Sequence, residues 1–391
     1  MADNMFAGLE VEEGEDVEVQ AQEKKKKKKK KKRSKKTREE LRKEEMSEAE
    51  LAKENEEAEK EGGKIAELDK AEMQPLTADQ DKKVQELKES ILSDSSLPLE
   101  DGHIKVWLAD TQPFKRFLLA RDFNMDASRK LLVDCIKWRH QFKPWSIKVT
   151  EIEPCLRGGH MYSPTFDKQG HACVYMRQHT EPDPTPDDVA MKYMMWSFEM
   201  AMYKMLRKTD GQRYKMVWFV SNSGYNPKYN RSMKFIKELA HNVQNYYPER
   251  LHRCYFFYAP TMFRLFWNVL KPFLDKSTRS KFTFVHGSNA EVERFLSESF
   301  DLNDVEDHFF GKKPSDEWEE EEYYKYCVEM EKEMQAYYAD RLDEINNPGK
   351  KERLEKERLE QEKKEKKAAK SKGKGKNKRK KEKESTGADN A

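Results

Sequence analysis

The stretch YYPERLHRCYFFYAPTMFRLFWNVLKPFLDKSTRSK, residues 246–281, decides the fold. It opens at the end of a predicted helix that stops at Pro248, because proline cannot continue a helix. The aromatic run at residues 254–258 is typical of a strand that is buried on both faces. The next segment, residues 262–274, is apolar almost all the way round, which predicts a helix that is buried or faces an oily surface. Charged residues flank this helix, so the stretch predicts an apolar wall with a polar rim.

Around this stretch, strands and helices alternate. The predicted strands are 172–176, 215–221, 254–258 and 282–285, and the predicted helices between them are 186–207, 232–246 and 262–274. Alternation at this spacing predicts βαβ crossovers and a mostly parallel sheet. Upstream, helices are predicted at 77–92, 113–122 and 126–141, with Thr77 and Gln80 as a capping box and Asp126 as an N-cap. The sequence therefore predicts an α/β protein with an N-terminal helical lobe.

Charge is concentrated at the two ends of the chain. Of the 391 residues 38% are charged and only 36% are hydrophobic, and the ends hold almost no aromatic residues. Such segments cannot bury enough surface to offset their chain entropy, so we expect them to be disordered. A further helix is predicted over residues 316–345, packing back on the domain rather than pairing with a partner helix. The predicted divisions are a charged tail with a lysine run at 1–76, the helical lobe at 77–145, the α/β lobe at 146–313, a C-terminal helix at 314–347 and a basic tail at 348–391.

Several classes of protein are disfavoured by missing motifs. The five cysteines form no CxxC pair, which argues against zinc ribbons and thioredoxin-type redox chemistry. There is no G-x-G-x-x-G, Walker loop, G-x-S-x-G or H-E-x-x-H motif, and the nine histidines show no metal-ligand spacing. We therefore expect no catalytic residues, no metal and no cofactor, although a triad can assemble from distant positions. No early apolar segment suggests a signal peptide, and no apolar run suggests a membrane span, so a cytoplasmic protein is expected.

The motifs in the central stretch resemble those of the CRAL-TRIO lipid-binding domain. YYPER at 246–250 is followed by a strand, by AP, by a helix ending in KPFLD and by TRSK at 278–281. Upstream, FLLARDFN at 117–124 is similar to the family's FLRARKFD signature, and a Trp-Arg pair follows at 138–139. GHACVY at 170–175 is similar to the DGRPVY that opens one of its strands. Of this family, the phosphatidylinositol/phosphatidylcholine transfer proteins are the most similar.

The resemblance implies a sheet floor and a gate helix that together enclose one lipid. It also implies reversible opening of the gate at a membrane, exchange of the lipid and no chemical change. Flexible, polarizable methionines in the 187–207 helix suit variable acyl chains, although an ordinary buried helix would look the same. The predicted pocket and gate residues are Met194, Met195, Trp218, Phe263, Phe266, Trp267, Leu270 and Phe273.

The head-group residues also follow from the resemblance. In its inositol-binding members the Glu of YPER bonds inositol hydroxyls, and a Thr and a Lys after the gate helix contact the phosphate; these are Glu249, Thr278 and Lys281 here. Arg121 and Arg250 are added as nearby cations. A carboxylate accepts hydrogen bonds from hydroxyls, and an ammonium offsets phosphate charge in a partly dry site. The alternative is that Glu249 and Arg250 only form a salt bridge at a helix end.

Two departures from the family pattern bear on the ligand. Asp122 stands where the signature has a lysine that meets the phosphate, which replaces an attractive charge with a repulsive one. Met216 and Trp218 stand where choline-binding members carry Ser and Thr, which disfavours phosphatidylcholine. Phosphatidylinositol is therefore the favoured ligand. Two alternatives stay open: a carrier of a sterol, a terpenoid or a tocopherol-like molecule, and a scaffold protein with a degenerate pocket.

The lysine-rich tails give the scaffold alternative its partners. Lys24 to Lys32 form an unbroken run, and residues 370–383 read KSKGKGKNKRKKEK. Such segments can bind anionic lipid or RNA, act as nuclear import signals or serve only as solubilising charged tails, and each lysine near an anionic leaflet contributes about 1 kcal/mol. We expect a monomer that touches membranes peripherally.

Overall fold

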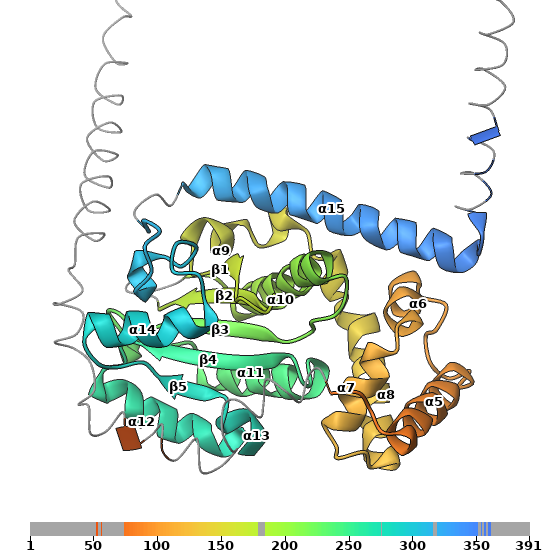
Figure 1. Cartoon of the computed structure of the whole chain (residues 1–391), viewed down its shortest axis with the longest axis horizontal. Helices are drawn as coiled ribbons and strands as arrows, with labels where there is room; N and C mark the ends of the chain where they lie inside the picture. Colours follow the sequence, from red (N-terminus) through yellow and green to blue (C-terminus); the bar gives the residue numbers. More distant parts are fainter. Residues whose placement is uncertain are drawn as a thin grey trace, which may run out of the picture.

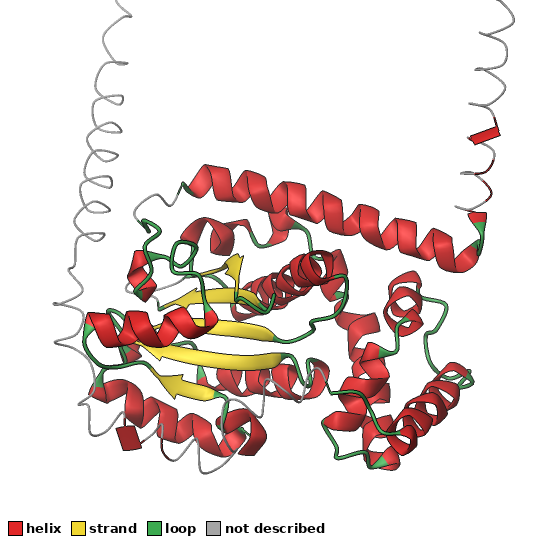
Figure 2. Ribbon diagram, viewed as in Figure 1, coloured by secondary structure: helices red, strands yellow, loops and turns green. Residues whose placement is uncertain are grey.

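The computed structural model describes residues 74–178, 184–274, 276–315 and 319–350, with isolated positions at 52, 53, 56, 353, 356, 359 and 360. The predicted disordered tails lie almost wholly outside these residues. Figure 2 shows an all-helical lobe beside a sheet that is surrounded by helices. The predicted α/β class, with a helical lobe preceding a mostly parallel sheet, is confirmed.

The helical lobe consists of α5 (Ala78–Leu92), α6 (Gly102–Ala109), α7 (Gln112–Leu119) and α8 (Met125–Phe142). The Thr77–Gln80 capping box at the start of α5 is present. The N-cap of α8 is Asn124, whose side chain accepts from the Ala127 amide at 3.0 Å, so the prediction of Asp126 as the cap was wrong. Asp126 instead lies in the first turn, where its negative charge interacts favourably with the positive end of the helix dipole.

The sheet has the order β1-β2-β3-β4-β5, with β1 antiparallel to β2 and the other pairs parallel. Its strands are β1 (Met161–Phe166), β2 (Ala172–Arg177), β3 (Met216–Ser221), β4 (Leu251–Phe257) and β5 (Phe282–Phe284). The two lobes are joined by η1 (Pro144–Ser146), η2 (Val149–Glu151) and α9 (Glu153–Gly158). Sequence reasoning missed β1, which adds the antiparallel edge.

Helices cover both faces of the sheet. On one face lie α10 (Asp187–Thr209), α11 (Met233–Tyr246) and α12 (Thr261–Leu270), and on the other lies α14 (Asn289–Ser299). The shorter helices are η3 (Pro227–Tyr229), η4 (Lys271–Phe273), α13 (Lys276–Arg279) and η5 (Asp307–Phe309). Side chains alternate between the faces, since Phe219 packs toward α14 whereas Trp218 packs toward α10 and α12.

The last described helix, α15 (Glu320–Asn346), lies across both lobes (Figure 1). At its start Glu321 pairs with Arg157 of α9 at 2.9 Å. In its middle Glu331 accepts from the Val149 amide at 2.7 Å, and near its end Leu342 lies against Gly102 of α6. The helix predicted over residues 316–345 is thus present and packs back on the chain.

Candidate functional site

A cavity of about 700 Å³ lies between the sheet and α10, α11 and α12. Its floor comes from the strands, its walls from α10 and α11, and its cover from α12. The main lining side chains are Trp218, Val220, Cys254 and Phe256 on the strands, Met194 and Phe198 on α10, Leu239 and Val243 on α11, and Phe263, Phe266, Trp267 and Leu270 on α12. We call this space the apolar cavity. Its volume is within the usual range for small-molecule sites.

The cover, α12, is apolar on its inner and outer sides. Phe263 and Trp267 are 2% and 3% exposed and pack on the sheet, with the Phe263 ring 5.1 Å from that of Phe256. On the outer side Leu265 is 69% exposed and Val269 is 51% exposed. An isolated exposed leucine is ordinary, but an apolar row on the outside of a cavity's cover is typical of a surface that meets another apolar phase.

One end of the apolar cavity is charged. The Glu249 carboxylate lies 3.3 Å from Lys215 Nζ and 3.6 Å from Lys281 Nζ, and both lysines are buried. Burial alone would raise the pKa of Glu249, but the charges of Lys281 and Lys215 outweigh it, so the pKa is lowered. The carboxylate is therefore ionised at neutral pH. Glu249 has a left-handed backbone (φ 55°), which fixes the turn between α11 and β4.

The other predicted head-group residues also line this cavity. Arg121, Thr278 and Lys281 line it together with Asp122, the departure from the family signature. Arg250 lines it as well, and its Nη1 donates to the Tyr214 carbonyl at 2.8 Å. Within the described part of the chain Glu249 pairs with lysines and not with Arg250, so the alternative of a simple Glu249–Arg250 bridge is wrong.

Two predicted pocket residues lie elsewhere. Met195 is fully buried in the core between α10 and the sheet, because one residue along a helix turns the side chain about 100° from Met194. Phe273 follows the proline at the end of α12, in η4, and is 41% exposed with its ring 5.2 Å from Lys237 Nζ. Neither residue lines the apolar cavity.

Sequence reasoning missed Lys215 as a partner of Glu249. It immediately precedes β3, and the parallel pairing that aligns Met216 with Leu251 brings it beside the turn before β4. Only the register between two distant strands reveals this contact. Phe198 lies on the predicted wall helix but was not among the predicted pocket residues; it stacks on Trp218 with ring centroids 5.2 Å apart.

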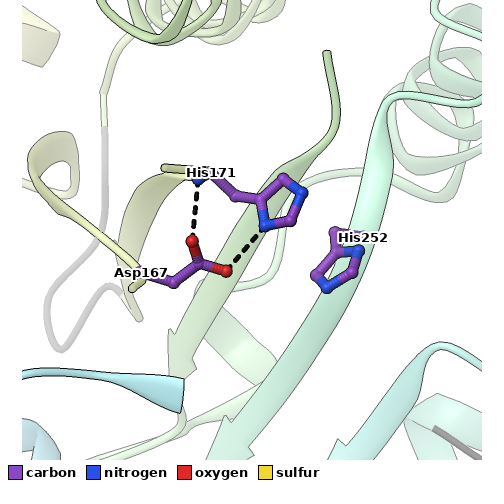
Figure 3. Close-up of side chains that lie close together, drawn as sticks. All are labelled: Asp167, His171 and His252. Atoms are coloured by element: carbon purple, nitrogen blue, oxygen red, sulfur yellow. Dashed lines mark hydrogen bonds and ion pairs between the residues drawn. The ribbon is translucent and has the colours of Figure 1, made fainter. Parts of the chain in front are cut away.

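A second cluster, which the histidine spacing did not predict, contains Asp167, His171 and His252 (Figure 3). Their candidate donor atoms all lie within 4.8 Å of one another. One Asp167 oxygen accepts from the His171 amide at 2.8 Å and the other is 2.7 Å from His171 Nδ1. The two imidazole rings stack at 4.0 Å. Because both carboxylate oxygens are engaged in this way, we assign the cluster to holding the β1–β2 turn against β4.

No helix among the described residues is long and apolar enough to cross a membrane.

Residues 156–311 match the CRAL/TRIO domain family. A CRAL-TRIO domain-containing protein of Schizosaccharomyces pombe is 24% identical over 65% of this chain and 25% of its own length. The SEC14 cytosolic factor of Candida glabrata is 27% identical, and the match covers 59% of this chain and 80% of that protein. The phosphatidylinositol/phosphatidylcholine transfer protein SFH4 of Arabidopsis thaliana is 26% identical, and the match covers 58% of this chain and 38% of that protein.

Among solved structures, that of Sfh5 aligns with a TM-score of 0.47 and 18% identity, covering 66% of this chain and 98% of that one. The matched region thus spans most of the SEC14 factor but well under half of the first relative and of the Arabidopsis protein. The chain carries a CRAL-TRIO domain and resembles the phosphatidylinositol/phosphatidylcholine transfer proteins, as its motifs predicted.

Proposed function

We propose that the chain binds one lipid in the apolar cavity and transfers it between membranes without changing it chemically. The observation that carries the proposal is an apolar cavity of about 700 Å³ with one charged end, formed by Glu249 and Lys281. Such a space suits an amphiphile, because burying acyl chains gains about 25 cal/mol per Å² while the polar head requires partners. The printed names of the SEC14 factor and the Arabidopsis transfer protein support this class of ligand.

The favoured ligand is phosphatidylinositol. In this proposal the Lys281 ammonium and the Thr278 hydroxyl donate to the phosphate, and Glu249 accepts from inositol hydroxyls. Arg121 supplies a further cation, which offsets the negative charge of Asp122 on the same wall. The partner lysine, Lys215, keeps Glu249 ionised and aimed at the head group.

The proposed gate is α12. In the closed state Phe263 and Trp267 cover the acyl chains, and at a membrane the exposed outer row, Met262, Leu265 and Val269, enters the interface first. This gives peripheral contact with the membrane. The reaction is an exchange, with no catalytic residue and no cofactor, and a cytoplasmic location fits the printed name of the SEC14 cytosolic factor.

The test compares two lysine variants of the full chain, one at a residue that lines the apolar cavity and one at a residue that does not. Lys281→Ala and Lys215→Ala each remove one buried lysine from Glu249 and leave the other in place, but only Lys281 lines the cavity. Each protein is incubated with mixed liposomes that contain phosphatidylinositol, re-purified and examined by native mass spectrometry. We expect Lys281→Ala to reduce phosphatidylinositol loading at least about tenfold more than Lys215→Ala does, as for loss of one charge-assisted hydrogen bond.

Equal loading in both variants would discard the phosphatidylinositol assignment. Stoichiometric loading of a sterol or another neutral hydrophobe would keep the transfer mechanism and change the ligand. A wild-type protein that stays empty would overturn lipid binding and favour a scaffold role.

A further inference from the structure

A second cavity, of about 160 Å³, lies where the helical lobe, α10 and α15 meet. Its lining differs from that of the apolar cavity, because guanidinium and phenol groups dominate it. The arginines are Arg116 on α7, Arg139 on α8, Arg213 and Arg250 on loops and Arg341 on α15, and the tyrosines are Tyr203, Tyr214, Tyr246, Tyr247, Tyr337 and Tyr338. We call this space the arginine cavity.

The carboxylates of the arginine cavity do not balance its arginines. Glu199 pairs with Arg139 at 2.9 Å and accepts from the Tyr247 hydroxyl at 2.8 Å. Arg341, near the rim, pairs with Glu344 on its own helix. Among the lining residues that the structure describes, the other acid is the exposed Asp110.

The remaining three arginines, Arg116, Arg213 and Arg250, form no ion pair with any residue that the structure describes. Each donates to a backbone carbonyl instead: Arg116 to Pro248 at 2.9 Å, Arg213 to Gln169 at 3.0 Å and Arg250 to Tyr214 at 2.8 Å. Neutral carbonyls satisfy single N–H groups but supply no countercharge, and Glu199, which already pairs with Arg139, offsets the charge of Arg250 only in part. The cavity therefore holds an excess of positive charge.

This excess is costly where it is buried. Arg116 is 1% exposed, and its Nε finds no hydrogen-bond partner among the described residues. Burial lowers the pKa of Arg116, and repulsion from Arg250 lowers it further. Burial likewise lowers the pKa of Arg250. A buried cation without a counter-charge destabilises a fold by several kcal/mol unless an anion accompanies it.

We propose that the arginine cavity binds a phosphate group. Guanidinium groups match phosphate oxygens in geometry and remain charged at any physiological pH, and the tyrosine hydroxyls add neutral donors. A cavity of about 160 Å³ admits a compact anion and excludes a whole lipid. The lining runs from the exposed Asp110 and Arg341 to the buried Arg116, so the cavity leads from the surface inward.

Arg250 lines both cavities and therefore separates them. The phosphate group has two possible sources: a free phosphate from solvent, or a further phosphate on the head of a lipid in the apolar cavity, distinct from the one that Lys281 and Thr278 hold in the proposed function. In either case it would neutralise Arg250, which adjoins Glu249 in sequence. The inference does not depend on lipid transfer, because a scaffold with an empty apolar cavity would retain the same arginines.

The experiment measures the thermal midpoint of the full chain in inorganic phosphate and in chloride at matched ionic strength. With phosphate at about ten times its Kd we expect a rise of about 3 °C. Arg213→Gln and Arg116→Met should each lose most of this rise, whereas Arg294→Gln, an exposed arginine on α14 that lines neither cavity, should retain it. The lysine-rich ends are identical in all four proteins, so their phosphate binding cancels.

Running the comparison on lipid-loaded and lipid-stripped protein separates the two sources. A rise in both forms indicates a site for free phosphate, and a rise only in the stripped form indicates that the lipid's phosphate occupies the site when present. No rise in either form of the wild type, or an equal rise in wild type and Arg213→Gln, would overturn the proposal. Arg213→Gln keeps the test decisive if Arg116→Met does not fold, because Arg213 is only partly buried.

Discussion

Both faces of the sheet carry apolar side chains, yet the face under α14 is packed (the solid face), whereas the other face borders a cavity under α12 (the hollow face). On the α14 face the Phe219 ring lies 5.1 Å from Phe257 and 5.0 Å from Phe300, and aromatic rings fill the layer. On the α12 face the neighbouring Trp218 and Phe256 line a cavity of about 700 Å³. Adjacent residues of one strand thus belong to a packed core and to a binding site.

The difference does not come from the strands. It comes from what covers them: α14 sends Val292 and Leu296 into the layer, whereas α12 lies over the sheet with its inner aromatics, Phe263 and Trp267, packed at the edge near β5. A continuous apolar run in a strand predicts that both of its faces are buried, but only the covering element decides whether a buried face is also filled.

The largest effect is expected for Phe219→Ala. Phe219 is fully buried in the solid layer, so removing its ring leaves a void and should lower the free energy of unfolding by about 3–5 kcal/mol. Urea unfolding measures the loss, with Phe219→Leu as the milder control. A loss below about 1 kcal/mol would mean that this face also tolerates empty space.

Trp218→Ala is the matched change on the hollow face. Trp218 is only partly buried and already borders a cavity, so we expect a smaller loss of about 1–2 kcal/mol in the free energy of unfolding. The variant should also load larger lipids, as seen by native mass spectrometry. If Trp218→Ala lowers the free energy of unfolding as much as Phe219→Ala does, the proposed difference between the solid and hollow faces is wrong.

Acid should weaken the charged end of the hollow face. The pKa of Glu249 is lowered in the folded chain, so its contribution to stability is complete above the ordinary value of 4.5 and is lost as the pH falls through the lower folded value. Between about pH 5 and pH 3 the free energy of unfolding should therefore fall more steeply with pH for wild type than for Glu249→Gln. Glu86→Gln, an exposed site on α5, serves as control and should keep the wild-type slope.

The smallest effect on stability is expected for Leu265→Lys, on the outer side of α12. Leu265 is 69% exposed, so the free energy of unfolding should change by less than about 0.5 kcal/mol. Lipid exchange between liposomes should nevertheless slow, because the charge opposes entry of α12 into the interface. Unchanged exchange rates would place membrane contact on another surface.

Much of this fold could be predicted because its signals are local. The Thr77 cap, the aromatic β4 and the apolar α12 each depend on periodicity or composition within one segment. The eight-residue α6 and the short β1 were missed, since α6 offers little beyond its Asp101 cap and β1 is defined by its pairing with β2. A strand whose sequence is MYSPTF needs that partner to be recognised.

The candidate site divides in the same way. Motifs placed Glu249, Thr278 and Lys281 together, and they line one cavity. Motifs could not predict Lys215 beside Glu249 or Arg116 beside Arg250, because these contacts depend on the register of strands and the docking of lobes. Long-range geometry, rather than residue type, was the missing information.

The helix α15 packs against both lobes and holds them together. It is bound to α9 through Arg157 and to α6 through Gly102, and its last turn reaches Lys105. A hinge motion that separated the helical lobe from the sheet would have to break these contacts along α15. Lifting α12 would instead disturb the packing of one helix on the sheet, through Phe263, Phe266, Trp267 and Leu270. In the proposed exchange of lipid, α15 therefore keeps the two lobes together while α12 is the part that moves.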